Sequence, residues 1–270
     1  MPIERRSGAA ERDGEPIYYE VAGSGFPLVL CHGAGGNHVS WFQQVVAFAG
    51  RYEVITWDHR GFGRSTREGI GDATISSSDL EAVLGAVGVE RAHVVAQSMG
   101  GWAALGFTLE HPTRVQTLTL CDTVAGITTP IVEQNWQDYV SRLRAHPPSG
   151  ALGESPAIGR RFTDENPVGA ALYQAIGSLN ADLSPELLAG LLGTKWPADA
   201  LAAVSCPTLF VVGDDDRIFP PDVIRDCATT INGAHVEVIP GAGHSPYFET
   251  PDAWNTVVAS FLAANDKGAS

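Results

Sequence analysis

Short runs of apolar residues alternate with longer stretches of mixed polarity along most of this chain. The apolar runs have the length and composition of strands buried on both faces, and the stretches between them are long enough for helices. This alternation predicts an α/β fold, in which crossover helices join the strands of a mostly parallel sheet. The predicted strands are Pro27–Cys31, Tyr52–Trp57, Ala92–Gln97, Val115–Cys121, Thr208–Val212 and His235–Ile239. The predicted helices are Ser40–Ala49, Ser78–Val87, Met99–Glu110, Pro221–Ile231 and Pro251–Ala264.

Two local signals add to this pattern. Asp13-Gly14 is a strong signal for a hairpin turn, and Ile17–Val21 has strand composition, so we expect an antiparallel hairpin at one edge of the sheet. Ser78 is followed three residues later by Glu81, which resembles a capping box and predicts that the second helix begins at Ser78.

Residues 125–196 interrupt the alternation, because they contain several amphipathic pieces separated by prolines and no convincing strand. Proline starts or breaks a helix, so this segment predicts a helical cap inserted after the sixth strand. Residues 1–124 and 197–270 then form one core domain, because 270 residues is near the upper size for a single hydrophobic core. The cap side chains that we expect to line a substrate pocket are Trp136, Tyr139 and Phe162.

The formal net charge of −14 is the one unusual feature of the composition. Negative charge repels phosphate backbones and anionic lipids, so we expect neither nucleic acid nor a membrane as a partner. Residues 1–17 carry charges throughout and have no apolar stretch long enough for a signal peptide, which favours a cytoplasmic protein. The cysteines lack the short spacing of a zinc site, so we expect no metal, no cofactor and free thiols at Cys31, Cys121, Cys206 and Cys227.

Ser98 lies where a run of strand-forming residues meets a turn of small residues and then a helix-forming stretch. This is the shape of a nucleophile elbow, in which a strained turn pushes the serine hydroxyl out of the sheet edge and into a cleft. The usual pattern is Gly-x-Ser-x-Gly, and here Ala96 takes the first position, which adds one methyl group where sheet and helix crowd together. Ser98 is therefore the candidate nucleophile.

A neutral serine hydroxyl needs a base, and the base needs an acid that orients it. His244 is the candidate base, because it lies in a glycine-rich loop after the last predicted strand, where the active-site loops of a parallel sheet gather. Asp216 is the candidate acid, because it follows a strand with the spacing Gly-x-x-Asp from Gly213. Three further aspartates could take this role: Asp214, Asp215 and Asp122, which follows the preceding strand.

Two backbone amides should bind the oxyanion that forms during acyl transfer. One is the amide of Met99, directly after the nucleophile, and the other is the amide of Ala34, in the glycine-rich stretch after the strand that ends at Cys31. That stretch lacks the Gly-Lys-Ser/Thr ending of a P-loop and the Gly-x-Gly-x-x-Gly spacing of a dinucleotide site, which argues against phosphate binding.

Together these segments resemble the α/β-hydrolase fold family over almost the whole chain. The resemblance implies a cap between the sixth and seventh strands, in agreement with the helical insertion, and a structural role for the turn that contains Asp58 and Arg60. The motifs that carry it are His32-Gly33, residues 58–65, Ser98-Met99-Gly100-Gly101, Gly213 with Asp216, and Gly243-His244-Ser245.

Within this family, we rank hydrolysis of a carboxylic ester or lactone through an acyl-enzyme first. Residues 121–130 resemble the segment after the sixth strand of 3-oxoadipate enol-lactonases, and a cap rich in leucine and aromatic residues predicts a small or medium, largely uncharged substrate. Carbon–carbon bond hydrolases that cleave vinylogous diketones share Ser-Met-Gly-Gly but commonly carry tryptophan where this chain has Ser245. Because one fold supports many functions, a cofactor-free oxygenase that uses the His-Asp pair and an inactive ligand receptor are also compatible with this family.

Overall fold

A computed structural model of the chain describes residues 3–67, 73–147, 149–180, 190–191 and 193–266. Its strands are β1 (Arg5–Arg12), β2 (Glu15–Ala22), β3 (Phe26–Cys31), β4 (Tyr52–Trp57), β5 (Ala92–Gln97), β6 (Val115–Cys121), β7 (Thr208–Gly213) and β8 (His235–Ile239). They form one eight-stranded sheet in the order β1-β2-β4-β3-β5-β6-β7-β8. The β1–β2 and β2–β4 pairs are antiparallel, and the pairs from β4 to β8 are parallel. The predicted fold class is therefore confirmed, including the N-terminal hairpin.

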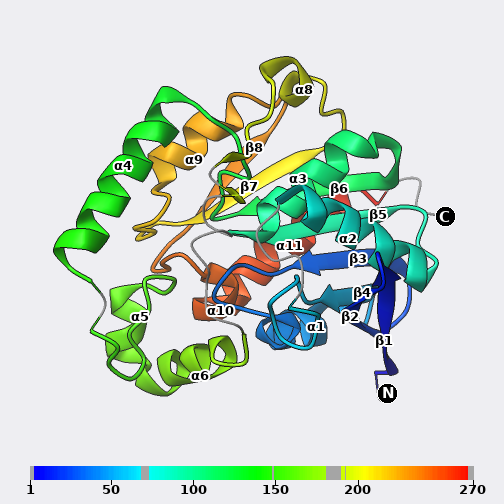
Figure 1. Cartoon of the computed structure of the whole chain (residues 1–270), viewed down its shortest axis with the longest axis horizontal. Coiled ribbons are helices and arrows are strands. Elements are labelled where there is room, and N and C mark those ends of the chain that lie inside the picture. Colours follow the sequence, from blue (N-terminus) through cyan, green and yellow to red (C-terminus); the bar gives the residue numbers. More distant parts are fainter. Residues whose placement is uncertain (1–2, 68–72, 148, 181–189, 192, 267–270) are drawn as a thin grey trace.

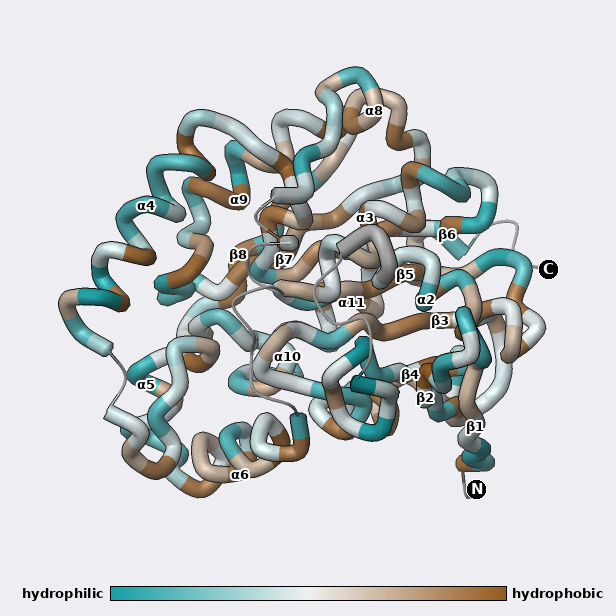
Figure 2. Tube along the Cα trace, viewed as in Figure 1, coloured by the Kyte–Doolittle hydropathy of each residue, from teal (hydrophilic) through white to brown (hydrophobic). Residues whose placement is uncertain are grey.

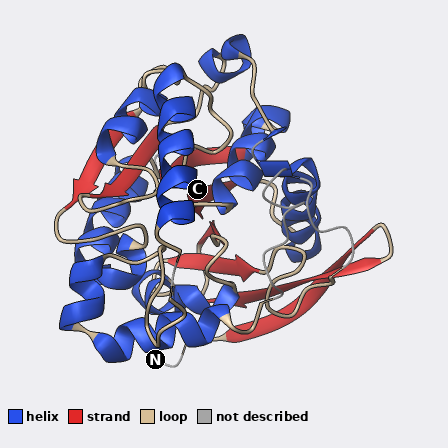
Figure 3. Cartoon of the chain, turned by 60° about the vertical axis from the view of Figure 1, so that its left-hand side comes forward, coloured by secondary structure: helices blue, strands red, loops and turns tan. Residues whose placement is uncertain are grey.

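Helices cover both faces of the sheet (Figures 1 and 3). The cluster of buried residues on one face includes side chains of α2, α3 and α9, and the cluster on the other face includes side chains of α1 and α11. These helices are α1 (Phe42–Phe48), α2 (Ala73–Val87), α3 (Gly100–Glu110), α9 (Pro221–Ala228) and α11 (Pro251–Ala264).

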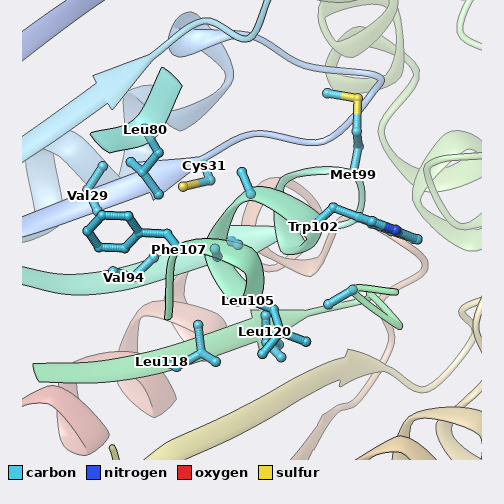
Figure 4. Packing of buried hydrophobic residues seen from close by; sticks show 14 of the residues in the cluster. Val29, Cys31, Leu80, Val94, Met99, Trp102, Leu105, Phe107, Leu118 and Leu120 are labelled. Atoms are coloured by element: carbon cyan, nitrogen blue, oxygen red, sulfur yellow. The ribbon is translucent and has the colours of Figure 1, made fainter. Parts of the chain in front are cut away.

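The side chains of β3 alternate between these two layers. Val29 and Cys31 belong to the cluster under α2, α3 and α9, whereas Leu28 and Leu30 belong to the cluster under α1 and α11. Figure 4 shows part of the first cluster, to which α3 contributes Phe107. Because strand side chains point alternately to opposite faces, one continuous apolar run fills both layers of the core.

Two helix starts differ from the predicted ones. α2 begins at Ala73, so Ser78 lies inside the helix and the predicted capping box is wrong. The Ser-x-x-Glu pattern is local, whereas the extent of α2 depends on packing of its apolar face, which includes the buried Leu80 and Leu84. α1 is preceded by a 3₁₀ turn, η1 (His38–Trp41), which is capped by the side chain of Asn37.

Several helices lie between β6 and β7, where the sequence predicts a cap (Figure 1). The described part of residues 125–196 contains no strand, and residues 148, 181–189 and 192 of this segment lie outside the described part. Figure 2 shows many hydrophilic positions along the first of these helices, which lies at the side of the molecule away from the β1–β2 hairpin. The helices in this region whose bounds the structure describes are α4 (Pro130–Ala145), α5 (Arg160–Glu165), α6 (Pro167–Gly177) and α8 (Ala198–Ala202), of which α8 lies beyond the predicted cap.

The four cysteines are free thiols, as predicted. Three of them are buried and Cys206 is partly exposed. Burial raises the pKa of Cys31 and of Cys227 to about 12, so these thiols act as apolar filler. None of the described helices has both the length and the apolar character that are needed to cross a bilayer.

The turn after β4 is held by buried polar contacts. The Asp58 carboxylate accepts hydrogen bonds from the backbone amides of His38 and Arg64, at 2.6 and 2.8 Å. Arg60 donates from Nε and Nη2 to the two carboxylate oxygens of Asp79 in α2, at 2.7 and 2.9 Å. These contacts tie the turn to the helix layer, which fits the structural role that we expected for Asp58 and Arg60.

Replacing Asp79 by alanine should lower the free energy of unfolding by about 3–5 kcal/mol, because it removes the buried carboxylate that accepts two hydrogen bonds from the Arg60 guanidinium. The matched control is Glu165→Ala, which removes an acid from an exposed pair with Arg161, where both side chains are about two-thirds exposed, at 66% and 65%. That change should cost less than about 0.5 kcal/mol. Urea unfolding of both variants measures the difference, and equal losses would contradict this interpretation.

Candidate active site

Ser98 lies in a tight turn between β5 and α3. Its backbone φ of 48° is in the left-handed region, and its amide donates a 2.9 Å hydrogen bond to the carbonyl of Cys121 at the end of β6. A methyl group at Gly100 would lie within 2.7 Å of the Cys31 carbonyl carbon, so the start of α3 approaches β3 as closely as glycine permits. Ala96, in the first position of the elbow motif, is fully buried, and its single methyl group fits there.

His244 lies in the loop after β8 and contacts Ser98 directly. Its Nε2 atom is 2.9 Å from Ser98 Oγ, and its Nδ1 atom is 2.9 Å from Asp216 Oδ2. The side chain of Gln97, the neighbour of Ser98, donates a 2.8 Å hydrogen bond to the backbone carbonyl of His244. The elbow therefore positions both the hydroxyl and the loop that carries the imidazole.

Asp216 is the one of the three consecutive aspartates that reaches His244. Its Oδ1 atom accepts hydrogen bonds from the amides of Ile218 and Phe219, at 2.8 and 3.1 Å, and the residue is buried. Asp214 instead accepts from the amide of Gly241, and Asp215 forms an exposed pair with Arg217. The two amides on Oδ1 leave Oδ2 to accept the Nδ1 proton of the imidazole.

Asp122, which the sequence also allows as the acid, lies beside this pair without replacing Asp216. It follows β6, is fully buried and accepts a 2.9 Å hydrogen bond from the amide of Gly213 on Oδ1. Burial raises the pKa of Asp122 well above its usual range, and the charge of Asp216 raises it further. A ligand atom from each of Asp122, Asp216 and His244 lies within 4.8 Å of the others. Both ring nitrogens of His244 already have partners, so we assign this cluster to the hydrogen-bonded triad and not to a metal.

The two amides predicted for the oxyanion flank Ser98. A methyl group at Gly33 would lie 2.9 Å from Ser98 Cβ, so the loop that contains Ala34 lies directly against the nucleophile. Among the described groups, neither the Ala34 amide nor the Met99 amide donates a backbone hydrogen bond in the turns and loops. The amides of Ala34 and Met99 therefore stay the predicted donors to the oxyanion.

A cavity of about 360 Å³ lies near the triad, although Ser98, Asp216 and His244 are not among its described lining residues. Phe219 connects the two, because it lines the cavity and its ring centre is 5.9 Å from that of His244. Trp136 of α4, one of the three residues predicted for a substrate pocket, also lines the cavity, and its ring stacks on Phe219. The described residues that line this cavity are Trp102, Val124, Gly126, Ile127, Thr128, Val132, Glu133, Trp136, Gln137, Leu191, Thr194, Lys195 and Phe219.

The other two predicted pocket residues lie elsewhere. Tyr139 packs against Trp136 and is not among the lining residues. Phe162 belongs to the hydrophobic cluster on the opposite face of the sheet, where its ring meets Phe248 edge-on. Phe162 therefore does not face the cavity. Its helix, α5, begins next to Gly159, which bonds to Glu249 after the loop of His244.

Contacts that sequence reasoning missed join this loop to the helical insertion. The Glu249 carboxylate accepts from the amides of Gly243 and Ser245 on either side of His244, and also from Gly159 in the insertion, at 2.8 to 3.0 Å. The Ser245 hydroxyl donates to the carbonyl of Ala157 at 2.6 Å. The sequence signal for this role was the position of Glu249 directly after two aromatic residues, Tyr247 and Phe248, both of which are buried.

The sequence model of the alpha/beta hydrolase fold family matches residues 27–251. The RutD protein of Caulobacter vibrioides, provisionally named a carbamate hydrolase, is 36% identical over 96% of this chain and 98% of its own. The 2-hydroxy-6-oxo-6-phenylhexa-2,4-dienoate hydrolase of Burkholderia cepacia is 27% identical over 92% of this chain and 91% of its own. The solved structure of Est816, described as an N-acyl homoserine lactone degrading enzyme, matches with a TM-score of 0.77 and 29% identity over 94% of this chain and 100% of its own.

The family match spans the elbow at Ser98, the acid at Asp216 and the loop of His244. The similarity to RutD extends over nearly the full length of both chains. From the arrangement of the sheet and from these comparisons, the chain belongs to the alpha/beta hydrolase fold family.

Proposed function

We propose that this protein is a serine hydrolase that cleaves a small or medium carboxylic ester or lactone through an acyl-enzyme. The observation that carries the proposal is the continuous hydrogen-bonded chain from Ser98 Oγ through His244 to Asp216, with both links at 2.9 Å. A nucleophile and base within hydrogen-bond reach, with a third group that orients the base, are the requirements for acyl transfer by serine.

In the first half of the reaction, Ser98 Oγ attacks the substrate carbonyl carbon while His244 Nε2 takes the hydroxyl proton. The negative charge that forms on the carbonyl oxygen is bound by the amides of Ala34 and Met99. Asp216 holds the Nδ1–H of the imidazole and stabilises its positive charge. His244 then donates its proton to the leaving alkoxide oxygen, and the carbon–oxygen bond breaks to leave the acyl group on Ser98.

In the second half, His244 takes a proton from a water molecule, whose oxygen attacks the acyl carbon. The same two amides bind the second oxyanion, and collapse of this intermediate returns the proton to Ser98 Oγ and releases the carboxylic acid. For a lactone, the alcohol and the acid are parts of one ring-opened product.

The cavity favours an uncharged substrate of limited size. Its walls are mainly apolar and aromatic, and its volume of about 360 Å³ suits a small molecule. The charged residues among its described lining, Glu133 and Lys195, form a 3.1 Å ion pair with each other. Similarity to a lactone-degrading enzyme supports the same substrate class.

Carbon–carbon bond hydrolysis is the second candidate, because of the similarity to the Burkholderia cepacia hydrolase. A dienoate substrate carries a carboxylate, which needs a cation or several donors in a site of low polarity. Among the described lining residues, Lys195 is the one cation, and Glu133 neutralises it. We therefore rank the ester or lactone first.

Ser98→Ala should abolish turnover of every ester and lactone in a panel that also includes carbamates and vinylogous diketones, with a loss of about 10⁶-fold in kcat. The control is Ser141→Ala, at an exposed position of α4, which should keep full activity. The substrate that is hydrolysed fastest identifies the class. An alanine variant that retains most of its turnover would rule out the acyl-enzyme and would mean that water attacks the substrate directly.

Asp216→Asn should lower kcat by about 10⁴-fold. The neutral amide cannot stabilise the positive charge of the imidazolium, and its NH₂ group can hold the imidazole in the wrong tautomer. Asp214→Asn and Asp215→Asn are the matched controls, since these carboxylates do not contact His244. Steady-state kinetics on one ester measures all three. A large loss of kcat in either control would show that Asp216 is not the acid of the triad.

Trp136→Ala should shift the preference of the enzyme towards esters with longer chains, because it enlarges the cavity next to Phe219. The ratio of kcat/KM for longer and shorter p-nitrophenyl esters measures this preference. Phe162→Ala is the control, because Phe162 packs on the other face of the sheet and its loss should leave the ratio unchanged. The assigned pocket is wrong if Phe162→Ala changes the ratio and Trp136→Ala does not.

A further inference from the structure

A second buried carboxyl group lies behind the triad, and the proposed mechanism does not use it. Asp122 has no exposed surface, and one of its oxygens accepts the Gly213 amide. The other, Oδ2, is buried and faces no donor among the described groups. A buried carboxylate oxygen without a donor is costly, so this atom requires an explanation.

The neighbouring Asp216 side chain provides the explanation for the buried Oδ2 atom of Asp122. A carboxylate oxygen of Asp122 and one of Asp216 lie within 4.8 Å of each other. Asp216 is already committed as an acceptor, with two amides on Oδ1 and the imidazole on Oδ2. Two carboxyl groups can share a hydrogen bond only if one of them carries a proton.

The surroundings of the two acids decide which of them carries it. Asp216 has three donors that favour its ionised form, whereas Asp122 has one. The other titratable groups around Asp122 are the Glu249 carboxyl, the Cys121 thiol, the Tyr173 hydroxyl and the His244 imidazole. The first three carry no positive charge, and His244 bonds to Asp216 instead of Asp122. Burial, followed by the charges of Asp216 and Glu249, holds the pKa of Asp122 well above its usual range.

We propose that Asp122 is a positioning residue of the triad, which holds a proton and donates a hydrogen bond from Oδ2 to the Asp216 carboxylate. This donor anchors the Asp216 carboxylate and reduces the negative charge that the imidazole experiences. The catalytic part of this proposal rests on the proposed serine-hydrolase function, whereas the protonation of Asp122 in the folded protein does not.

Asparagine is the decisive substitution, because it reproduces a protonated aspartate at this site. Its carbonyl oxygen can accept from the Gly213 amide and its amide group can donate to Asp216. Asp122→Asn should therefore keep kcat/KM within about threefold, whereas Asp122→Ala should lose about 10- to 100-fold, the effect of removing a hydrogen bond to a charged group. If Asp122 were the ionised acid of the triad, Asp122→Asn would fall as far as Asp216→Asn, and that result would overturn the proposal.

The pH profile separates positioning from a general loss of structure. Without the donor, Asp216 stabilises the imidazolium more strongly, so the acid limb of kcat/KM should move to higher pH in Asp122→Ala. It should stay in place in Asp122→Asn. A lower rate with an unmoved acid limb in Asp122→Ala would mean that Asp122 acts only through packing, and would contradict the proposal.

Stability provides a test that does not depend on activity. If Asp122 is protonated when folded and ionised when unfolded, folding takes up one proton, so the wild type loses stability as the pH rises from about 4 towards neutral. Asp122→Asn has no such loss, and its gain in urea midpoint over the wild type should grow across that range. A difference that is constant or shrinks with pH would overturn the protonation of Asp122. If this test succeeds and Ser98→Ala keeps its activity, the proposed function fails and the shared proton remains.

Discussion

The backbones of three parallel strands approach each other closely at their carboxyl ends, and the whole site depends on this crowding. Ser98 leaves β5 with a positive φ, its amide bonds to the end of β6, and Gly100 lies against the carbonyl group of Cys31 at the end of β3. A side chain at position 100 would clash with the backbone of β3, so glycine is required there, and the strained turn directs the Ser98 hydroxyl out of the sheet edge. The strain at Ser98 is offset by the hydrogen bonds and packing of the sheet around it.

Buried acids surround the base, although the protein already has a net charge of −14. Backbone amides satisfy most of them: two donate to Asp216, one to Asp122 and three to Glu249. Amides fixed in loops cost no side-chain entropy and cannot titrate, which suits a site where a proton moves at each step. Asp122 has one amide donor, and the proton that it shares with Asp216 satisfies its second oxygen.

The helical insertion contributes to the site in two ways. α4 supplies Trp136 to the wall of the cavity, and the segment before α5 bonds to the loop of His244 through Ala157 and Gly159. The insertion therefore contributes both to the wall of the cavity and to the position of the loop that carries His244. This arrangement couples the position of the imidazole to the structure of the insertion.

The sequence by itself determined the order of strands and helices, the elbow at Ser98 and the loop that carries His244, because these depend on local apolar runs, turns and glycines. It left the acid open between Asp216 and three other aspartates, since adjacent side chains in a loop differ only in where the folded backbone points them. It placed Phe162 in the pocket and a helix start at Ser78, and both were wrong because packing between distant elements sets helix extent and facing. Only the tertiary structure brought Asp122, Glu249 and Phe219 to the base, because their roles depend on contacts between strands and loops that are far apart along the chain.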